Sequence, residues 1–108
     1  MRFVIKRGST LPKLLFQVLD ERSGIPVDVT GATVSFKMKR LDDGSVVVNS
    51  GAEIENATQG LVSYSWKPND TENVGIYVGE FDIAFPDGTV LTVPRKDTLE
   101  IWVIDDVV

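Results

Sequence analysis

The sequence predicts an all-β protein, and more narrowly an immunoglobulin-like antiparallel β-sandwich of about eight strands, on three observations. Apolar and polar residues alternate with a period of two along most of the chain, as in residues 34–39 and 62–67. No stretch shows a sustained helical period. Clusters of Gly, Pro, Asn and Asp interrupt the alternation at short intervals. With 108 residues, the chain is expected to form a single domain, residues 1–108, with its own core.

Each expected strand is a run of alternating residues bounded by turn residues, which is typical of a sandwich. In the best of these, Phe81, Ile83 and Phe85 share the face expected at the centre of the core, and the turn Pro86-Asp87-Gly88 closes a hairpin onto the next strand. The expected strands are residues 3–6, 13–19, 32–40, 45–49, 61–67, 75–85, 89–93 and 98–104.

Residues 73–79, NVGIYVG, match the immunoglobulin pattern D-x-G-x-Y-x-C, with Asn73 in place of Asp and Gly79 in place of Cys. On this interpretation Tyr77 forms a tyrosine corner, its hydroxyl bonded to upstream backbone. The alternative is that Tyr77 is an ordinary core aromatic at a strand start. Trp66 shares a face with Val62 and Tyr64, so it is expected in the same core, in space that a disulfide would otherwise span.

The amino-acid composition excludes most catalytic mechanisms. The chain has no Cys and no His, which excludes disulfides, Ser-His and Cys-His nucleophile systems and the common zinc sites. Adjacent acidic residues, such as Asp42-Asp43, are expected in solvated turns, where adjacency does not bring two carboxylates onto one substrate. No calcium-loop or phosphate-loop motif is present. We therefore expect no enzyme activity, no catalytic residue, no metal and no cofactor.

Charge and hydropathy limit the partners. The net charge of −5 argues against nucleic acid and anionic membranes, which require a cationic surface. No apolar run is long enough for a membrane helix, and the N-terminus lacks the apolar region of a secretory signal. Eight of the eleven basic residues lie in residues 1–40 with only three of the sixteen acidic ones, an asymmetry that head-to-tail self-association could use. Because sandwich strands interleave in space, this asymmetry need not appear on the surface.

A partner surface is expected where a strand is apolar on both faces. In residues 98–104, Trp102 and Ile104 lie opposite the face that contains Leu99, Ile101 and Val103. The apolar start of the chain raises the same possibility. The candidate interface residues are Trp102, Ile104, Phe3 and Ile5. Loops 42–45, 50–60 and 68–74 are further accessible candidates, since loops on a rigid sandwich often carry recognition.

Four segments in this order resemble the N-terminal domain family of the upper baseplate protein of siphophages that infect Gram-positive hosts. They are FVIKRGSTLPKL, GIPVDVTGATVSFKMK, ATQGLVSYSWKPNDTENVGIYVGEFDIAFPDGTVLTVP and the closing TLEIWVI. The resemblance covers nearly the whole chain. It implies an immunoglobulin-like sandwich in a virion, made in the host cytoplasm, which joins other phage structural proteins of the tail or baseplate and carries no catalytic residues.

Two alternative functions are kept beside this one. In the family this domain usually precedes further modules, whereas the present sequence ends after the last expected strand. A capsid decoration or neck protein of the phage head is therefore an alternative. A carbohydrate-binding or host-adhesion module is another, and it requires an aromatic platform outside the core.

Overall fold

In the computed structural model, which describes residues 1–105, nine strands and one 3-10 helix follow one another along the chain. The strands are β1 (Arg2–Lys6), β2 (Leu14–Gln17), β3 (Thr33–Arg40), β4 (Val46–Gly51), β5 (Glu53–Asn56), β6 (Leu61–Tyr64), β7 (Gly75–Ala84), β8 (Val90–Val93) and β9 (Leu99–Ile104). The 3-10 helix, Pro68–Thr71, lies between β6 and β7. The last three positions of the expected domain 1–108 lie outside the described residues.

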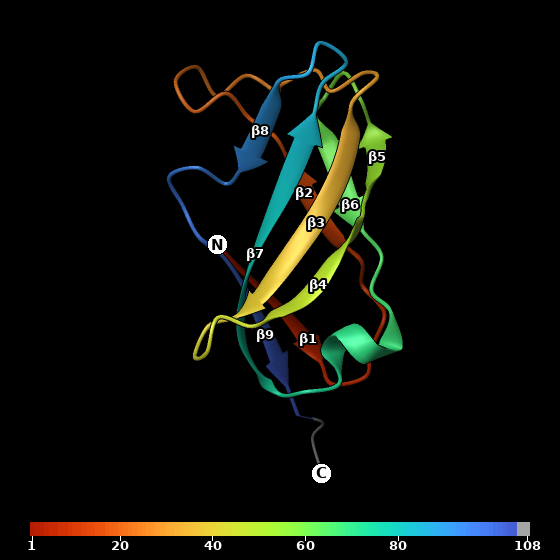
Figure 1. The fold of residues 1–108 in the computed structure, drawn as a ribbon, viewed down its shortest axis with the longest axis vertical. Helices are drawn as coiled ribbons and strands as arrows, with labels where there is room; N and C mark the ends of the chain where they lie inside the picture. The colour runs from red at the N-terminus through yellow and green to blue at the C-terminus, as the bar shows by residue number, and fades with distance from the viewer. Residues whose placement is uncertain (106–108) are drawn as a thin grey trace.

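The strands form two sheets that face each other, as the all-β immunoglobulin-like sandwich requires (Figure 1). The six-stranded sheet has the order β1-β9-β7-β3-β4, and β8 also pairs with β7. The three-stranded sheet has the order β2-β6-β5. Strands β1 and β9 run in parallel, and the other paired strands are antiparallel. The molecule is elongated, 47 × 23 × 23 Å, with β1 and β9 towards its lower end in Figure 1.

The main difference from the sequence prediction is β5, which was expected to be part of an exposed loop, residues 50–60. The chain leaves β4 at Gly51 and almost at once enters β5, so one extended segment forms an edge of both sheets. Because Glu53, Glu55 and Asn56 are poor strand formers, the segment resembled a loop in sequence. Its pairing with β6 provides the backbone hydrogen bonds that favour a strand.

Inward-facing residues of the two sheets form one apolar core. The rings of Phe36 and Tyr64 stack with centroids 4.7 Å apart, and Phe36 also contacts Phe81 at 4.9 Å. Trp66 is buried and meets Tyr64 edge to face at 5.2 Å, so the prediction that Trp66 is a core residue is confirmed. Burial of these aromatics from both sheets adds to the apolar burial that dominates the favourable free energy of folding.

Gly79 takes the place of the immunoglobulin cysteine because the space above it is already filled. A Cβ atom at Gly79 would lie 2.7 Å from Cδ1 of Ile101 and 2.9 Å from Cε1 of Phe36. Trp66 lies in the core beside Phe36, with ring centroids 5.9 Å apart. Phe36 of β3 and Ile101 of β9 therefore pack over the bare backbone of Gly79 between them, within the six-stranded sheet.

Tyr77 forms the tyrosine corner that residues 73–79 predicted. Its hydroxyl donates a hydrogen bond to the backbone carbonyl of Asn73 at 2.6 Å. The same hydroxyl accepts one from Nη1 of Arg40 at 3.1 Å. The corner therefore fixes the start of β7 to the end of β3.

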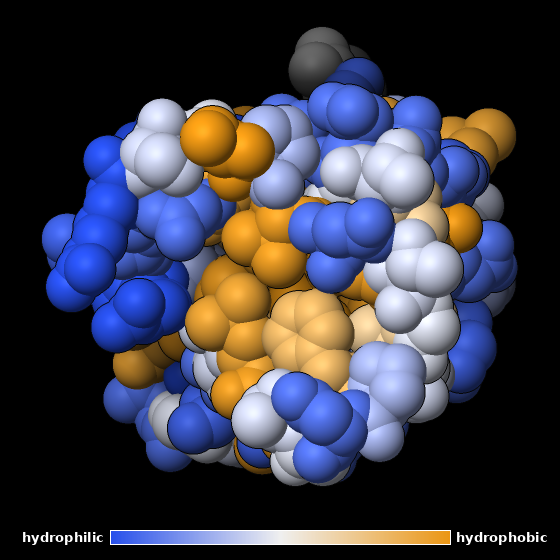
Figure 2. All heavy atoms as spheres, turned by 90° about the horizontal axis from the view of Figure 1, so that it is seen from above, coloured by the Kyte–Doolittle hydropathy of each residue, from blue (hydrophilic) through white to orange (hydrophobic). Residues whose placement is uncertain are grey.

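The core is incompletely covered at the upper end of the molecule. Figure 2 shows apolar side chains gathered there in a hollow that is ringed by hydrophilic ones. The partly buried residues that pack against the core near the β2–β3 and β7–β8 loops are Val27, Ala32, Phe85 and Leu91. At this end, apolar side chains between the two sheets are therefore partly accessible to solvent.

Candidate protein interface

A row of four apolar side chains crosses the outer face of the six-stranded sheet. Trp102 of β9 is paired in register with Val4 of β1 on one side and with Ile76 of β7 on the other. Leu41, which follows β3, donates its backbone N–H to the carbonyl of Ile76 at 3.0 Å and so extends the row. Paired residues of neighbouring strands place their side chains on the same face. The row is therefore continuous across four adjacent segments of the chain.

Much of this row is accessible. Val4 is 47% exposed and Leu41 is 54% exposed, whereas Ile76 and Trp102 are partly buried between their neighbours. Ile104, two residues after Trp102 on the same face, is 37% exposed. We call these five residues, Val4, Leu41, Ile76, Trp102 and Ile104, the outer-face patch.

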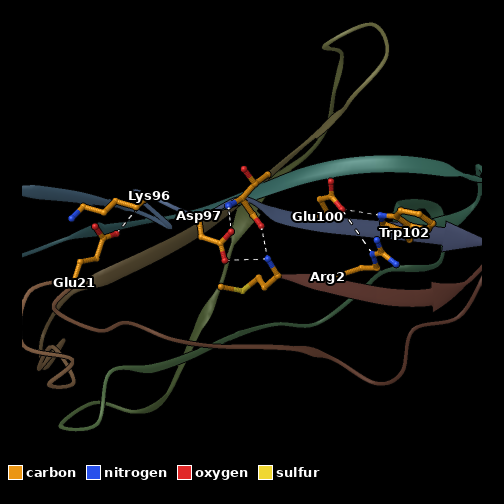
Figure 3. A network of polar contacts seen from close by, with 8 residues as sticks. Arg2, Glu21, Lys96, Asp97, Glu100 and Trp102 are labelled. Carbon is orange, nitrogen blue, oxygen red and sulfur yellow. Dashed lines mark hydrogen bonds and ion pairs between the residues drawn. The ribbon is translucent and has the colours of Figure 1, made fainter.

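An arginine covers the tryptophan at the centre of the patch. The guanidinium carbon of Arg2 lies 3.9 Å from the centroid of the Trp102 ring, within cation–π range. Glu100 accepts a hydrogen bond from Nε1 of Trp102 at 3.2 Å, and its carboxylate lies 3.9 Å from Nε of Arg2 (Figure 3). The three side chains come from positions two residues apart or directly paired on β1 and β9, which places them on one face.

The four interface candidates from the sequence divide between the two faces of the sheet. Trp102 and Ile104 lie on the outer face, as expected. Ile5 is only 3% exposed and belongs to the core, so its side chain is not accessible to a partner. Phe3 also points inward and stacks on Trp66 with centroids 5.8 Å apart. Ile5 and Phe3 therefore support the sheet from inside.

Sequence reasoning did not single out Leu41 and Ile76, and within the apolar start Phe3-Val4-Ile5 it selected Phe3 and Ile5 as candidates instead of Val4. In β1 every residue from Phe3 to Ile5 is apolar, so alternation alone does not show which of them faces outward. The signal is the pairing of Val4 with Trp102, which requires the parallel register of β1 and β9. Leu41 was missed because it comes after the strand and beside the acidic turn Asp42-Asp43.

The upper part of the same outer face carries several charged and polar side chains. Lys37 of β3 is paired with Glu80 of β7. Asp82 accepts a hydrogen bond from the hydroxyl of Thr92 at 2.5 Å. The exposed Val90 of β8, which is paired with Ala84, lies on this same part of the face.

The acidic residues of the loops stabilise turns. The carboxylates of Asp28, Asp43 and Asp87 each accept bonds from the hydroxyl and the backbone N–H of the residue two positions later. These hydrogen bonds hold the pKa of each carboxyl below its usual value. Among residues 1–105, no group of three acidic side chains lies close enough together to hold a metal ion.

The other loops predicted as accessible have their own local structure. Residues 42–45 form the exposed turn between β3 and β4. Residues 68–74 contain the 3-10 helix, where Asp70 accepts hydrogen bonds from the backbone N–H of Lys67 at 2.9 Å and from the hydroxyl of Tyr64 at 2.5 Å. Burial and this carboxylate raise the pKa of Tyr64. Within the described residues there is no helix long and apolar enough to cross a membrane.

A comparison with protein-family models matches residues 8–93 to the BppU N-terminal domain, the N-terminal domain of the phage baseplate upper protein. The chain belongs to this family. The match covers most of the chain and confirms the resemblance seen in the sequence. A search of curated protein sequences finds no match.

Solved structures share the fold of this family member. One is the N-terminal domain of phage TP901-1 ORF48, with a TM-score of 0.66, 15% identity, and coverage of 94% of this chain and 82% of that chain. Another is CopC from Methylosinus trichosporium OB3b, with a TM-score of 0.53, 15% identity and the same coverage of both chains. At this identity the likeness shows the fold alone.

Proposed function

We propose that the protein is a non-enzymatic structural component of a phage tail or baseplate, and that the outer-face patch binds another structural protein of the virion. Membership of the BppU N-terminal domain family supports a tail or baseplate role. The observation that supports this binding surface is the row Val4–Trp102–Ile76–Leu41, which crosses neighbouring strands on the outside of the sheet.

The physical reason is the cost of leaving this row in water. Each apolar Å² removed from water contributes about 25 cal/mol, and sheet faces that meet only solvent normally carry polar residues. Here an aromatic ring and four aliphatic side chains occupy adjacent positions. A flat apolar surface bordered by Arg2, Glu100 and Lys6 has the composition of an interface with an apolar centre and a polar rim.

The same geometry does not favour the carbohydrate-binding alternative. A sugar ring stacks on an open aromatic face, and the guanidinium of Arg2 lies over the ring of Trp102. A protein partner can use Arg2 and Trp102 together as a stacked pair, since Arg and Trp are frequent at the energetic centres of interfaces. The partner surface is therefore proposed to be protein, and self-association through the patch is one form of it.

The test compares two valines on the outer face of the same sheet. Val4 lies in the patch, and Val90 of β8, 63% exposed, lies at the other end beside the polar region. A phage that lacks the gene is complemented with the wild-type chain, with Val4→Glu or with Val90→Glu. Density-purified particles are then analysed by quantitative mass spectrometry against the major capsid protein.

We expect the wild-type chain and Val90→Glu in particles at a small fraction of the capsid protein, and Val4→Glu to be depleted about tenfold, as loss of a central contact predicts. Abundance close to that of the capsid protein would favour head decoration and overturn the tail or baseplate role. The same measurement on separated heads and tails would identify a neck position, which would also overturn the tail or baseplate role. Equal incorporation of Val4→Glu and Val90→Glu would overturn the role of the patch.

A further inference from the structure

A second surface, on the opposite sheet, has the properties of a peptide-binding edge. Within residues 1–105, β2 pairs with β6 on one side only, so it is an edge of the three-stranded sheet. The N–H of Val18 donates to the carbonyl of Gly60 on the β6 side at 2.8 Å. Because backbone groups alternate in direction along a strand, those of Leu15 and Gln17 point to the open side.

A groove of about 380 Å³ runs along this open side, between β2 and the connection from β8 to β9. Its walls include inward-facing residues of both sheets, namely Phe16 of β2 and Val93 of β8. The apolar lining residues are Met1, Phe16, Leu19, Val93 and Pro94, and the polar ones include Asp20, Glu21, Lys96 and Asp97. The side of the sandwich is thus open to an apolar side chain from outside.

The groove is held open by contacts that cross its end. The carboxylate of Glu21, in the β2–β3 loop, accepts the backbone N–H group of Arg95 at 3.2 Å. It also accepts that of Lys96 at 3.3 Å (Figure 3). Asp97 is bonded to the backbone N–H of Thr98 and to the ammonium group of Met1, and both contacts hold the pKa of its carboxyl below the usual value. A preformed groove requires little ordering when a ligand binds.

The composition of β2 also favours pairing with another strand. Charged residues on edge strands discourage unwanted pairing. The edges β1 and β5 carry them, as Arg2 and Lys6 and as Glu53 and Glu55, whereas the edges β4 and β8 carry none. Strand β2 reads LLFQ and has none. Its outward-facing Leu15 is 54% exposed.

We propose that the open edge of β2 binds an extended segment of another protein as an added strand. The segment forms backbone hydrogen bonds with Leu15 and Gln17. One apolar side chain of the segment enters the groove beside Phe16, Leu19 and Val93, and the next side chain lies on the outer face near Leu15. This is strand addition, in which the backbone provides affinity and a pocket for alternate side chains provides specificity.

The occupant is a tail or linker of a different protein. A second copy that paired through its own β2 would leave the groove empty, because the inward-facing Leu14 and Phe16 of that copy are buried in its own core. The polar residues of the groove also select the segment. Asp20, Glu21 and Asp97 outnumber the cations Lys96 and the Met1 ammonium, so a basic residue next to the apolar anchor is favoured.

This inference does not depend on the outer-face patch, which lies on the outside of the other sheet. The first step of the test uses the full chain to select binders from an mRNA-displayed library of random peptides about ten residues long, enough for one strand. The most enriched peptide is synthesised and titrated into the ¹⁵N-labelled chain. We expect enriched peptides to share an apolar residue next to a basic one, and amide shifts to be confined to residues 15–19 and 93–97.

Two substitutions of one residue then isolate the backbone contribution. Both substitutions remove the hydrogen bond from the Gln17 side chain to the Gln59 carbonyl. Gln17→Pro also removes the outward backbone N–H, a change that edge strands tolerate, whereas Gln17→Ala keeps it. Gln17→Pro is expected to bind the peptide about fivefold to tenfold more weakly than Gln17→Ala, the effect of one lost hydrogen bond. If Gln17→Pro does not fold, Leu19→Glu, which places a charge on the groove wall, is expected to weaken binding about tenfold.

Three results would overturn the proposal: a library that yields no enriched peptide, amide shifts that map away from β2, or variants that bind as tightly as the wild type. Particle incorporation of Val4→Glu is measured separately. Failure of the peptide site therefore leaves the role of the outer-face patch unaffected, and the reverse also holds.

Discussion

Residues 1–105 contain two pairs of an arginine and an aromatic residue, which differ in how firmly the arginine is held. At the end of β3, Arg40 bonds to the Tyr77 hydroxyl, to the carbonyl of Val74 at 3.3 Å and to Asp42 at 3.1 Å. On the outer face, Arg2 lies over Trp102, and its ion pair with Glu100 spans 3.9 Å.

This difference suggests that the Arg40–Tyr77 pair supports the fold and that the Arg2–Trp102 pair is available for binding. Arg40 makes directed hydrogen bonds around a buried tyrosine, so each partner depends on the others, and Asp42 raises the pKa of the guanidinium further. Arg2 is exposed and loosely paired, so it can change position when another protein covers Trp102. The first pair should therefore affect unfolding, and the second should affect binding.

The largest effect on stability is expected from Tyr77→Phe. The change removes the hydroxyl that donates to the Asn73 carbonyl and accepts from Arg40, leaving both groups without this partner at the start of β7. We expect the free energy of unfolding to fall by about 1–3 kcal/mol. Urea denaturation measures it, with an unchanged m-value as the control. A loss below about 0.5 kcal/mol would contradict a structural role for the corner.

Gly75→Ala tests how tightly Arg40 is held. A Cβ atom at Gly75 would lie 3.1–3.2 Å from three guanidinium atoms of Arg40, so Arg40 would have to move. We expect a loss of about 1 kcal/mol, because crowding outweighs the gain from a stiffer unfolded chain. In an Arg40→Ala background the crowding is absent, and Gly75→Ala should be neutral or stabilising. A double-mutant cycle that shows no coupling would contradict this account.

Trp102→Ala should affect stability less than it affects binding. The ring is partly buried and lies outside the core, so its removal is expected to cost about 0.5–1 kcal/mol in unfolding free energy. Incorporation into particles should fall at least as far as for Val4→Glu. A stability loss of several kcal/mol, with normal incorporation of the folded fraction, would instead make Trp102 architectural.

Most of the fold was predictable because it depends on local patterns. Alternation and turn residues located eight of the strands, and the segment NVGIYVG indicated the tyrosine corner. Strand β5 was not predictable, since its pairing with β6 outweighs the poor strand preference of its acidic residues. The parallel pairing of β1 with β9 joins the two ends of the chain and leaves no local signal.

The candidate site was only half predictable for the same reason. Trp102 and Ile104 could be identified because the opposite face of β9 is clearly the core face. In β1, Phe3, Val4 and Ile5 are all apolar, and a shift of one residue exchanges the two faces. Only the register with β9 shows that Val4 is outward and that Ile5 is buried.

The smallest effect on stability is expected from Arg2→Ala. An exposed cation–π contact and a long ion pair together contribute little, so the unfolding free energy should change by less than about 1 kcal/mol. The accessibility of the Trp102 ring to a quencher should change more, because the guanidinium of Arg2 lies over this ring. Arg2 covers no other aromatic ring among the described residues. Acrylamide should therefore quench tryptophan fluorescence more strongly in Arg2→Ala, while buried Trp66 contributes an unchanged background. Arg2→Lys keeps the charge but loses the planar group, so its quenching should be intermediate between that of the wild type and that of Arg2→Ala. If quenching were the same in all three proteins, Arg2 would not cover Trp102 in solution, and the open ring would again suit a carbohydrate.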